Sequence, residues 1–306
     1  MSSAIAGQVN NQASNQEDYR AFMCDKDLEG RVQCHICPHR CLLKEGQVGL
    51  CRARRGGQGG VVSDAYGKMT SLALDPIEKK PLARFMPGSR ILSVGSFGCN
   101  LRCPFCQNAS IAHAGIEDVP WQKITPEQLV EQALYLKSRG NVGIAYTYNE
   151  PLVNYEFVLD CAKRSHEAGL INVLVSNGMA NLEVINELAP FLDAVNIDLK
   201  GFTQEFYDFV GGSLDTVKQT IEQLVACSTC HVEVTTLVIP GKNDTEEEID
   251  ALSYWLASLN PEIPYHVSRF FPCYKMKNED PTPVRTVYHL AEVARKHLRY
   301  VYTGNC

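Results

Sequence analysis

Strand-like and helix-like segments alternate strictly between about Gly88 and Gly304, and this alternation constrains the fold more than any other feature of the sequence. Six apolar segments predict strands, and each is followed by a segment that predicts a helix. The strands are expected at residues 91–97, 142–148, 171–176, 194–200, 231–239 and 265–271. Strict alternation implies parallel strands joined by right-handed crossovers. Eight such units close a complete barrel, so six predict an open, partial (β/α)6 barrel.

The expected helices are bounded by residues that favour helix ends. Thr125 fits an N-cap, Pro126 fits the first helical position, and Gln128 completes a capping box. Gly140 is expected to end this helix. The later helices are expected over residues 154–168, 182–192 and 215–226, from Glu246 onward, and over residues 286–297.

Three cysteines lie in a short loop that directly follows the first expected strand. Cys99, Cys103 and Cys106 have the spacing C-x3-C-x2-C, at the carboxyl end of that strand. Three thiolates hold three corners of a [4Fe–4S] cluster and leave one iron without a protein ligand. A structural zinc site needs a fourth ligand, and the nearest candidate, His113, is seven residues from Cys106. A disulfide framework needs an oxidising compartment, which nothing in the sequence indicates.

Phe105 makes the loop pattern more specific. With this residue, the loop resembles the C-x3-C-x-aromatic-C signature of the radical S-adenosylmethionine (SAM) superfamily. The resemblance implies that the iron without a protein ligand chelates the amino and carboxylate groups of SAM. It also implies that Phe105 borders the adenine, and that the fold is a partial (β/α)6 barrel, in agreement with the alternation of strands and helices.

Polar side chains follow the later strands, where a parallel barrel keeps its functional groups. SAM carries an amino group, a carboxylate and a ribose, which need a carboxylate, hydrogen-bond donors and hydroxyl partners. The candidate SAM-binding residues are Phe105, Asn149, Glu150, Ser176, Asn177, Asp198, Lys200 and His266. Taken singly, a strand-end residue of this kind also fits a cap, a turn or a loop. The convergence of five strand ends favours a binding site.

Two strand-end motifs extend the resemblance. Residues 148–151, Tyr-Asn-Glu-Pro, are similar in position to the Gly-Gly-Glu-Pro motif of radical SAM enzymes, which implies that Glu150 faces the SAM ammonium group. Tyr and Asn replace the two glycines here. Residues 198–200, Asp-Leu-Lys, are similar to a motif of the glycyl-radical-enzyme activases, such as pyruvate formate-lyase activase.

A second group of cysteines precedes the expected barrel. Cys34, Cys37, Cys41 and Cys51 have the spacing C-x2-C-x3-C-x9-C, and four thiolates close a tetrahedral metal site. Zinc would make this site structural, whereas a second iron–sulfur cluster would make it an electron relay. The sequence leaves both open. We divide the chain into a disordered tail at residues 1–23, a cysteine-rich metal-binding segment at 24–88 and the partial barrel at 89–306.

The segment from Cys34 to Gly88 resembles one group within the superfamily. The residues that carry this resemblance are Cys-x2-Cys-Pro-His-Arg-Cys at 34–41, Asp-Pro-Ile-Glu-Lys-Lys-Pro-Leu at 75–82 and Phe-x-Pro-Gly at 85–88. They look like the radical SAM enzyme of the AmmeMemoRadiSam system. The resemblance implies companion proteins of the Memo and AMMECR types.

Composition limits the partners and the compartment. The 306 residues carry a formal net charge of −6, which argues against nucleic acid as the main partner. No apolar run approaches the roughly 18 residues that a membrane span requires. Thirteen cysteines without a secretory signal favour reduced, metal-binding thiols in the cytoplasm.

Together these features predict a radical SAM enzyme. The resemblance implies that a reduced [4Fe–4S] cluster cleaves SAM to methionine and a 5′-deoxyadenosyl radical, which abstracts hydrogen from a substrate. An electron donor such as flavodoxin or ferredoxin is then needed. The Asp-Leu-Lys motif and the companion proteins favour a protein or peptide substrate. The alternatives are a small-molecule substrate, or a non-catalytic, zinc-stabilised adaptor that binds a partner protein.

Overall fold

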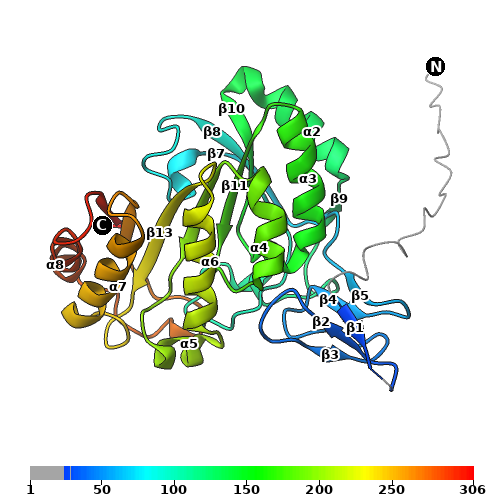
Figure 1. Ribbon diagram of the computed structural model, residues 1–306, viewed down its shortest axis with the longest axis horizontal. Helices are drawn as coiled ribbons and strands as arrows, with labels where there is room; N and C mark the ends of the chain where they lie inside the picture. Colours follow the sequence, from blue (N-terminus) through cyan, green and yellow to red (C-terminus); the bar gives the residue numbers. More distant parts are fainter. Residues whose placement is uncertain (1–23, 28) are drawn as a thin grey trace, which may run out of the picture.

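The computed structural model describes residues 24–27 and 29–306, so the tail expected at residues 1–23 lies outside the described residues. Its central element is an eight-stranded sheet in the order β15-β14-β13-β12-β11-β10-β8-β7 (Figure 1). The strands are β7 (Ser71–Pro76), β8 (Arg90–Gly95), β10 (Asn141–Tyr146), β11 (Ile171–Ser176), β12 (Ala194–Asp198), β13 (His231–Val238), β14 (Tyr265–Arg269) and β15 (Val301–Gly304). Neighbouring strands from β8 to β15 pair in parallel, whereas β7 is antiparallel to β8.

The six strands expected from the sequence are β8 and β10 to β14, and the prediction of a partial barrel is confirmed. Two strands were missed, one at each edge of the sheet. The strand β7 lies in the segment that the sequence analysis assigned to the N-terminal region, yet it pairs along its whole length with β8. The strand β15 extends the parallel sheet beyond β14.

Helices cover the outer face of the sheet (Figure 1). They are α2 (Pro126–Tyr135), α3 (Tyr155–Glu167), α4 (Leu182–Leu188), α6 (Leu214–Ala226), α7 (Glu246–Leu259) and α8 (Val284–Ala294). The two short helices α1 (Ala109–Ala112) and α5 (Gln204–Val210) lie instead in loops at the carboxyl ends of the strands. The capping box at the start of α2 is present: the Thr125 hydroxyl accepts a hydrogen bond from the Gln128 backbone amide, and the Gln128 side-chain oxygen accepts one from the Thr125 backbone amide. Gly140 ends the following 3-10 turn with φ of +85°. None of the helices in the described part of the chain has the length and apolar character that a membrane span requires.

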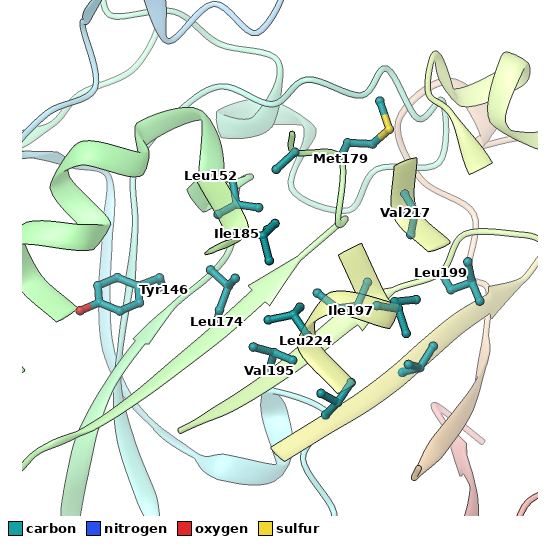
Figure 2. Packing of buried hydrophobic residues seen from close by; sticks show 14 of the residues in the cluster. Tyr146, Leu152, Leu174, Met179, Ile185, Val195, Ile197, Leu199, Val217 and Leu224 are labelled. Atoms are coloured by element: carbon teal, nitrogen blue, oxygen red, sulfur yellow. The ribbon is translucent and has the colours of Figure 1, made fainter. Parts of the chain in front are cut away.

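The main core lies between the sheet and these helices. Figure 2 shows Leu174, Val195 and Ile197 of the sheet beside Ile185 of α4 and Leu224 of α6, all buried. Each buried aliphatic side chain of this kind contributes about 1.5–3 kcal/mol relative to an exposed one. This packing fixes the helices against the strands, and therefore fixes the loops that leave the strand ends.

A smaller apolar cluster fills the inside of the partial barrel. Ile77 and Leu82, from the connection between β7 and β8, pack against Ile91, Val173 and Ala194 on the inner face of the strands. All five side chains are completely buried. The inside of the sheet is thus packed at the level where β12 begins, and it opens only toward the carboxyl ends of the strands.

The cysteine-rich segment forms two small antiparallel sheets beside one end of the main sheet (Figure 1). The first contains β1 (Cys24–Lys26), β2 (Val32–Cys34) and β3 (Leu42–Leu43), and the second is the hairpin of β4 (Arg54–Gly56) and β5 (Val61–Ser63). The pair β6 (Lys68–Met69) and β9 (Gln122–Lys123) follows. The segment is held to the barrel by buried contacts, including the ion pair between Arg54 of β4 and Glu156 of α3.

Candidate active site

A cavity of about 270 Å³ lies at the carboxyl ends of the parallel strands. The cysteine loop and almost all the polar residues that were predicted from the strand ends line this cavity. The predicted residues that line it are Cys99, Cys103, Phe105, Cys106, Asn149, Glu150, Ser176, Asn177, Asp198 and Lys200. Strand ends far apart in the sequence therefore converge on one site, as the pattern indicated.

Backbone contacts to two other segments fix the cysteine loop. The Cys99 amide donates to the Cys51 carbonyl at 3.1 Å, and the Arg102 amide donates to the Val210 carbonyl at 2.7 Å. Gly98 has φ of +88°, and a Cβ at this position would lie 2.6 Å from the Cys51 carbonyl oxygen. Only glycine fits such a close approach without strain. The protein's own backbone contacts therefore hold the loop in position.

The three thiols of the loop lie in a buried setting near Lys200. Burial raises the pKa of Cys103 to about 11, although Lys200 opposes the shift. Across residues 24–27 and 29–306, no group of three Cys, His, Asp or Glu side chains is arranged to hold a single metal ion. Cys99, Cys103 and Cys106 all line the cavity, so the site has the three thiol ligands that a [4Fe–4S] cluster with one open iron needs.

Phe105 and Asn149 hold the loop from two sides. The Phe105 ring is buried and stacks on Phe209 with ring centroids 6.3 Å apart. The Asn149 side-chain amide donates to the carbonyls of Phe97 and Gly98 at 3.1 and 3.0 Å, and its oxygen accepts from the Ser96 amide at 2.8 Å. Asn149 thus ties the end of β8 to the end of β10.

Glu150 presents a buried carboxylate to the cavity. It accepts hydrogen bonds from the Ser176 hydroxyl at 2.8 Å, the Asn177 amide at 2.8 Å and the Leu152 amide at 3.0 Å. Burial nevertheless raises the pKa of Glu150 to about 7, and Asp198 adds to the shift. A positively polarised group beside this carboxylate would favour its ionised form.

Asp198 and Lys200 form an ion pair at the end of β12. The Asp198 carboxylate lies 2.7 Å from Nζ of Lys200. The Lys200 carbonyl accepts from the Asn243 side chain at 2.8 Å, and its amide donates to the Tyr207 hydroxyl at 3.2 Å. Burial lowers the pKa of Lys200, but Asp198 and Cys103 outweigh it and hold the pKa above its ordinary value. Lys200 is therefore a fixed positive charge in the cavity wall.

Asn177 connects the carboxylate network to the cysteine loop. Its side-chain nitrogen lies 3.6 Å from Sγ of Cys99 and donates to the Asn100 side chain at 2.9 Å. The Asn100 nitrogen in turn donates to the Met179 carbonyl at 2.6 Å. A thiolate at Cys99 would thus have an amide N–H within reach.

The structure does not bring His266 to the cavity, in contrast to the sequence-based expectation. His266 is the second residue of β14, and its Nε2 lies 2.6 Å from the buried Glu233 carboxylate. Glu233 also accepts from the backbone amides of Ala83 and Arg84, while the His266 ring stacks on Tyr302. His266 therefore belongs to the network that holds the connection between β7 and β8 inside the barrel.

The cavity is also lined by polar residues that the sequence analysis did not name as site residues, among them Gln107, Asn108 and Thr147 near the cysteine loop and three residues of the last strands. Thr235 lies on β13, Ser268 lies on β14, and Asn305 follows β15. The Asn305 side chain donates to the Ser268 hydroxyl at 3.1 Å. Ser268 was detectable as the residue two positions beyond His266 on the same strand face. Asn305 follows a strand that was not predicted.

The four cysteines of the N-terminal segment lie around a second, smaller cavity. Cys34, Cys37, Cys41 and Cys51 all line it, together with Arg54. The spacing of these cysteines in the sequence thus corresponds to proximity in space.

Comparison with known proteins identifies the family of this chain. A model of the Radical SAM superfamily matches residues 93–252, a little more than half of the sequence. The chain belongs to the radical SAM superfamily. A protein of Methanocaldococcus jannaschii, described as uncharacterized, is 38% identical over 287 residues, which cover 93% of this chain and 84% of that protein.

Two further likenesses involve proteins with a described activity. The pyruvate formate-lyase 1-activating enzyme of Escherichia coli K12 is 25% identical over 193 residues, which cover 59% of this chain and 75% of the enzyme. The crystal structure of a radical SAM methyltransferase from Sphaerobacter thermophilus has a TM-score of 0.56 at 17% identity, and covers 72% of this chain and 67% of that one. The second likeness concerns the fold alone.

Radical SAM proteins use a [4Fe–4S] cluster and SAM as cofactors, and the site has the groups that both need. Three cysteines that line one cavity would hold three irons of a cluster and leave one iron open. The same cavity contains a carboxylate, a lysine and several amide and hydroxyl groups for the polar parts of SAM.

Proposed function

We propose that this radical SAM enzyme abstracts hydrogen from a protein or peptide substrate, in the manner of an activase. The observation that carries the proposal is the charge of the cavity wall. Among its described lining residues, Lys200 is the one cation, and Asp198 already neutralises it at 2.7 Å. The rest of the wall beyond the cysteine loop consists of uncharged amides, hydroxyls and apolar groups, apart from Glu150.

Such a wall suits a neutral, polar substrate. A nucleoside triphosphate or another multiply charged anion needs several free cationic donors. A peptide backbone needs only amide and hydroxyl partners, which Asn108, Ser268 and Asn305 supply near the cavity. The likeness to a pyruvate formate-lyase activating enzyme supports the same substrate class.

Each residue of the site has a definite task in this proposal. Cys99, Cys103 and Cys106 hold the cluster, and the bound cluster and SAM together supply reductive SAM cleavage and the hydrogen-abstracting radical. Glu150 accepts a hydrogen bond from the SAM amino group, and Phe105 borders the adenine.

The neighbouring polar residues orient these groups. Ser176 and the Asn177 amide hold the Glu150 carboxylate in place. Asn149 fixes the start of the cysteine loop through its hydrogen bond to the Gly98 carbonyl. Lys200 offers the remaining N–H donors of its ammonium group to the carboxylate or ribose oxygens of SAM, and Asp198 holds that group in position.

The proposed partners follow from this chemistry. Reductive cleavage of SAM needs a low-potential one-electron donor of the flavodoxin or ferredoxin class. The resemblance of residues 34–88 to the AmmeMemoRadiSam system suggests Memo-type and AMMECR-type proteins as substrate or companions. We place the reaction in the cytoplasm, where cysteines remain reduced.

The substrate class is tested by measuring 5′-deoxyadenosine formed from SAM by anaerobically reconstituted, dithionite-reduced protein. We expect a purified Memo-type or AMMECR-type protein to raise its rate of formation, and GTP to leave the rate unchanged. The Cys99→Ala variant with the same additions gives the background, and Cys161→Ala, a buried change outside the cavity, is the matched control. Stimulation by GTP and none by either protein would contradict the proposed substrate class.

A further inference from the structure

The four N-terminal cysteines surround a cavity that the catalytic site does not include. Cys34, Cys37 and Cys41 come from β2 and the turn that follows it, and Cys51 comes from the next loop. The Cys34 amide donates to the Cys41 carbonyl at 2.9 Å, which closes the turn. Four thiols on one short, cross-connected segment form a metal-binding donor set.

The sequence allowed two metal centres for these thiols. A zinc ion would take the four thiolates alone and make the site structural. A [4Fe–4S] cluster would add sulfide ions that accept hydrogen bonds, and it could exchange an electron with a neighbouring cluster. Two features beside the four cysteines favour the cluster: a buried N–H of Arg54 that lacks an acceptor among the described residues, and a backbone contact with the catalytic loop.

Arg54 gives a second, independent indication of a ligand in this cavity. Its side chain is 3% exposed, lines the cavity, and forms an ion pair with Glu156 through its terminal nitrogens. Among the described residues, however, Nε of Arg54 has no hydrogen-bond acceptor. A buried N–H without an acceptor costs about 1–3 kcal/mol. The sulfur atoms of an anionic cluster would supply the missing acceptor.

The position of Cys51 connects this cavity to the catalytic loop. Its carbonyl oxygen accepts the hydrogen bond from the Cys99 amide at 3.1 Å, so one hydrogen bond separates the backbones of two metal-binding cysteines. Gly98 permits this approach, because a Cβ at residue 98 would lie 2.6 Å from the Cys51 oxygen and 2.7 Å from Cβ of Ala53.

We propose that Cys34, Cys37, Cys41 and Cys51 hold a second [4Fe–4S] cluster, which passes electrons to the catalytic cluster through the contact between Cys51 and Cys99. One electron from a donor of the ferredoxin or flavodoxin class reduces the second cluster from the 2+ to the 1+ state. Its return to 2+ reduces the catalytic cluster by the same single electron, and no atom is transferred. The relay rests on the proposed function, whereas the presence of the second cluster does not.

The metal content of the protein tests the second cluster directly. We expect about eight irons and eight sulfides per chain after anaerobic reconstitution, and about four of each in the triple variant Cys99→Ala/Cys103→Ala/Cys106→Ala. The remaining cluster of that variant should give an electron paramagnetic resonance signal on reduction. About four irons with one zinc in the wild-type protein, or about four irons and no other metal, would overturn the proposal. If the triple variant fails to fold, the iron and sulfide content of the wild-type protein still shows whether a second cluster is present.

The relay is tested with the double variant Cys37→Ser/Cys41→Ser, whose catalytic cysteines are intact. We expect it to form 5′-deoxyadenosine with dithionite, which reaches the catalytic cluster directly, and to fall to background with a ferredoxin-class protein donor. The single variant Cys230→Ser, outside both cavities, is the control and should work with both reductants. Wild-type behaviour of the double variant with the protein donor would overturn the relay. If the wild-type protein forms no 5′-deoxyadenosine, the proposed function is wrong. The iron content then still shows whether the second cluster is present.

Discussion

Glu150 offers a quantitative test of the SAM site, because burial raises its pKa to about 7 against an ordinary value of 4.5. A carboxyl group with a raised pKa is neutral below that pH in the folded protein. In the proposed site, the ionised form is the better acceptor for the SAM amino group, so the contribution of Glu150 to SAM affinity is expected to increase as the pH rises through 7. The ionised fraction grows about tenfold between pH 6 and pH 8.

The perturbation is Glu150→Gln, which keeps the shape of the side chain and removes its charge. A hydrogen bond to a charged group contributes about 1.5–3 kcal/mol, so we expect the dissociation constant for SAM to rise about 10- to 150-fold at pH 8. The ratio of variant to wild-type dissociation constants should then shrink about tenfold at pH 6. Any other group whose titration changes both dissociation constants by the same factor has no effect on this ratio.

The assay is equilibrium SAM binding to the reconstituted proteins across this pH range. Ser176→Ala removes the 2.8 Å hydrogen bond to the carboxylate and should move the midpoint of the pH dependence upward. Glu131→Gln, on the exposed face of α2, is the matched control. A ratio that stays constant from pH 6 to pH 8, or SAM binding by Glu150→Gln at wild-type affinity, would refute the assigned role.

Three further predictions concern the support of the site. His266→Gln should lower the free energy of unfolding by about 1–3 kcal/mol and leave SAM affinity unchanged, whereas weaker SAM binding without a loss of stability would return His266 to the cofactor site. Burial opposes ionisation of Glu233, but the hydrogen bonds to its carboxylate outweigh burial and lower its pKa to about 2. The ionised carboxylate therefore contributes about 3 kcal/mol to the free energy of unfolding above pH 4.5, and this contribution is lost as the pH falls toward 2. Urea unfolding of Glu233→Gln at pH 7 should show that loss, and an unchanged midpoint would exclude it. Gly98→Ala should reduce both iron content and stability, because its Cβ would overlap the Cys51 carbonyl, and full iron content would contradict the tight docking of the loop.

The sequence predicted the parts of the fold that rest on strong local patterns. The strands β8 and β10 to β14 are apolar runs bounded by helix signals, and the capping box at Thr125 marked the start of α2 correctly. The edge strands β7 and β15 were missed for a physical reason. Each has only one neighbour in the sheet, so its residues are half-exposed and its pattern is weak.

The site was predictable to the extent that it depends on strand ends. A strand's end can be located in the sequence to within about 2–4 residues, but the depth of a side chain inside the barrel depends on the stagger of neighbouring strands. His266 and Ser268 face the same way on β14, and only the assembled sheet shows that Ser268 reaches the cavity while His266 lies beneath it. The contact between Cys51 and Cys99 depends likewise on tertiary packing, which no spacing rule reveals.

The central claim is that the cavity at Cys99, Cys103 and Cys106 holds a cluster that cleaves SAM. The most direct measurement is the amount of 5′-deoxyadenosine formed from SAM after anaerobic reconstitution and reduction, set beside the iron content of the same sample. We expect formation of the nucleoside by the wild-type protein, and both its loss and a loss of about four irons in the Cys99→Ala/Cys103→Ala/Cys106→Ala variant. A colourless wild-type protein that forms no 5′-deoxyadenosine, with an iron content that the variant leaves unchanged, would contradict the claim and favour a non-catalytic adaptor.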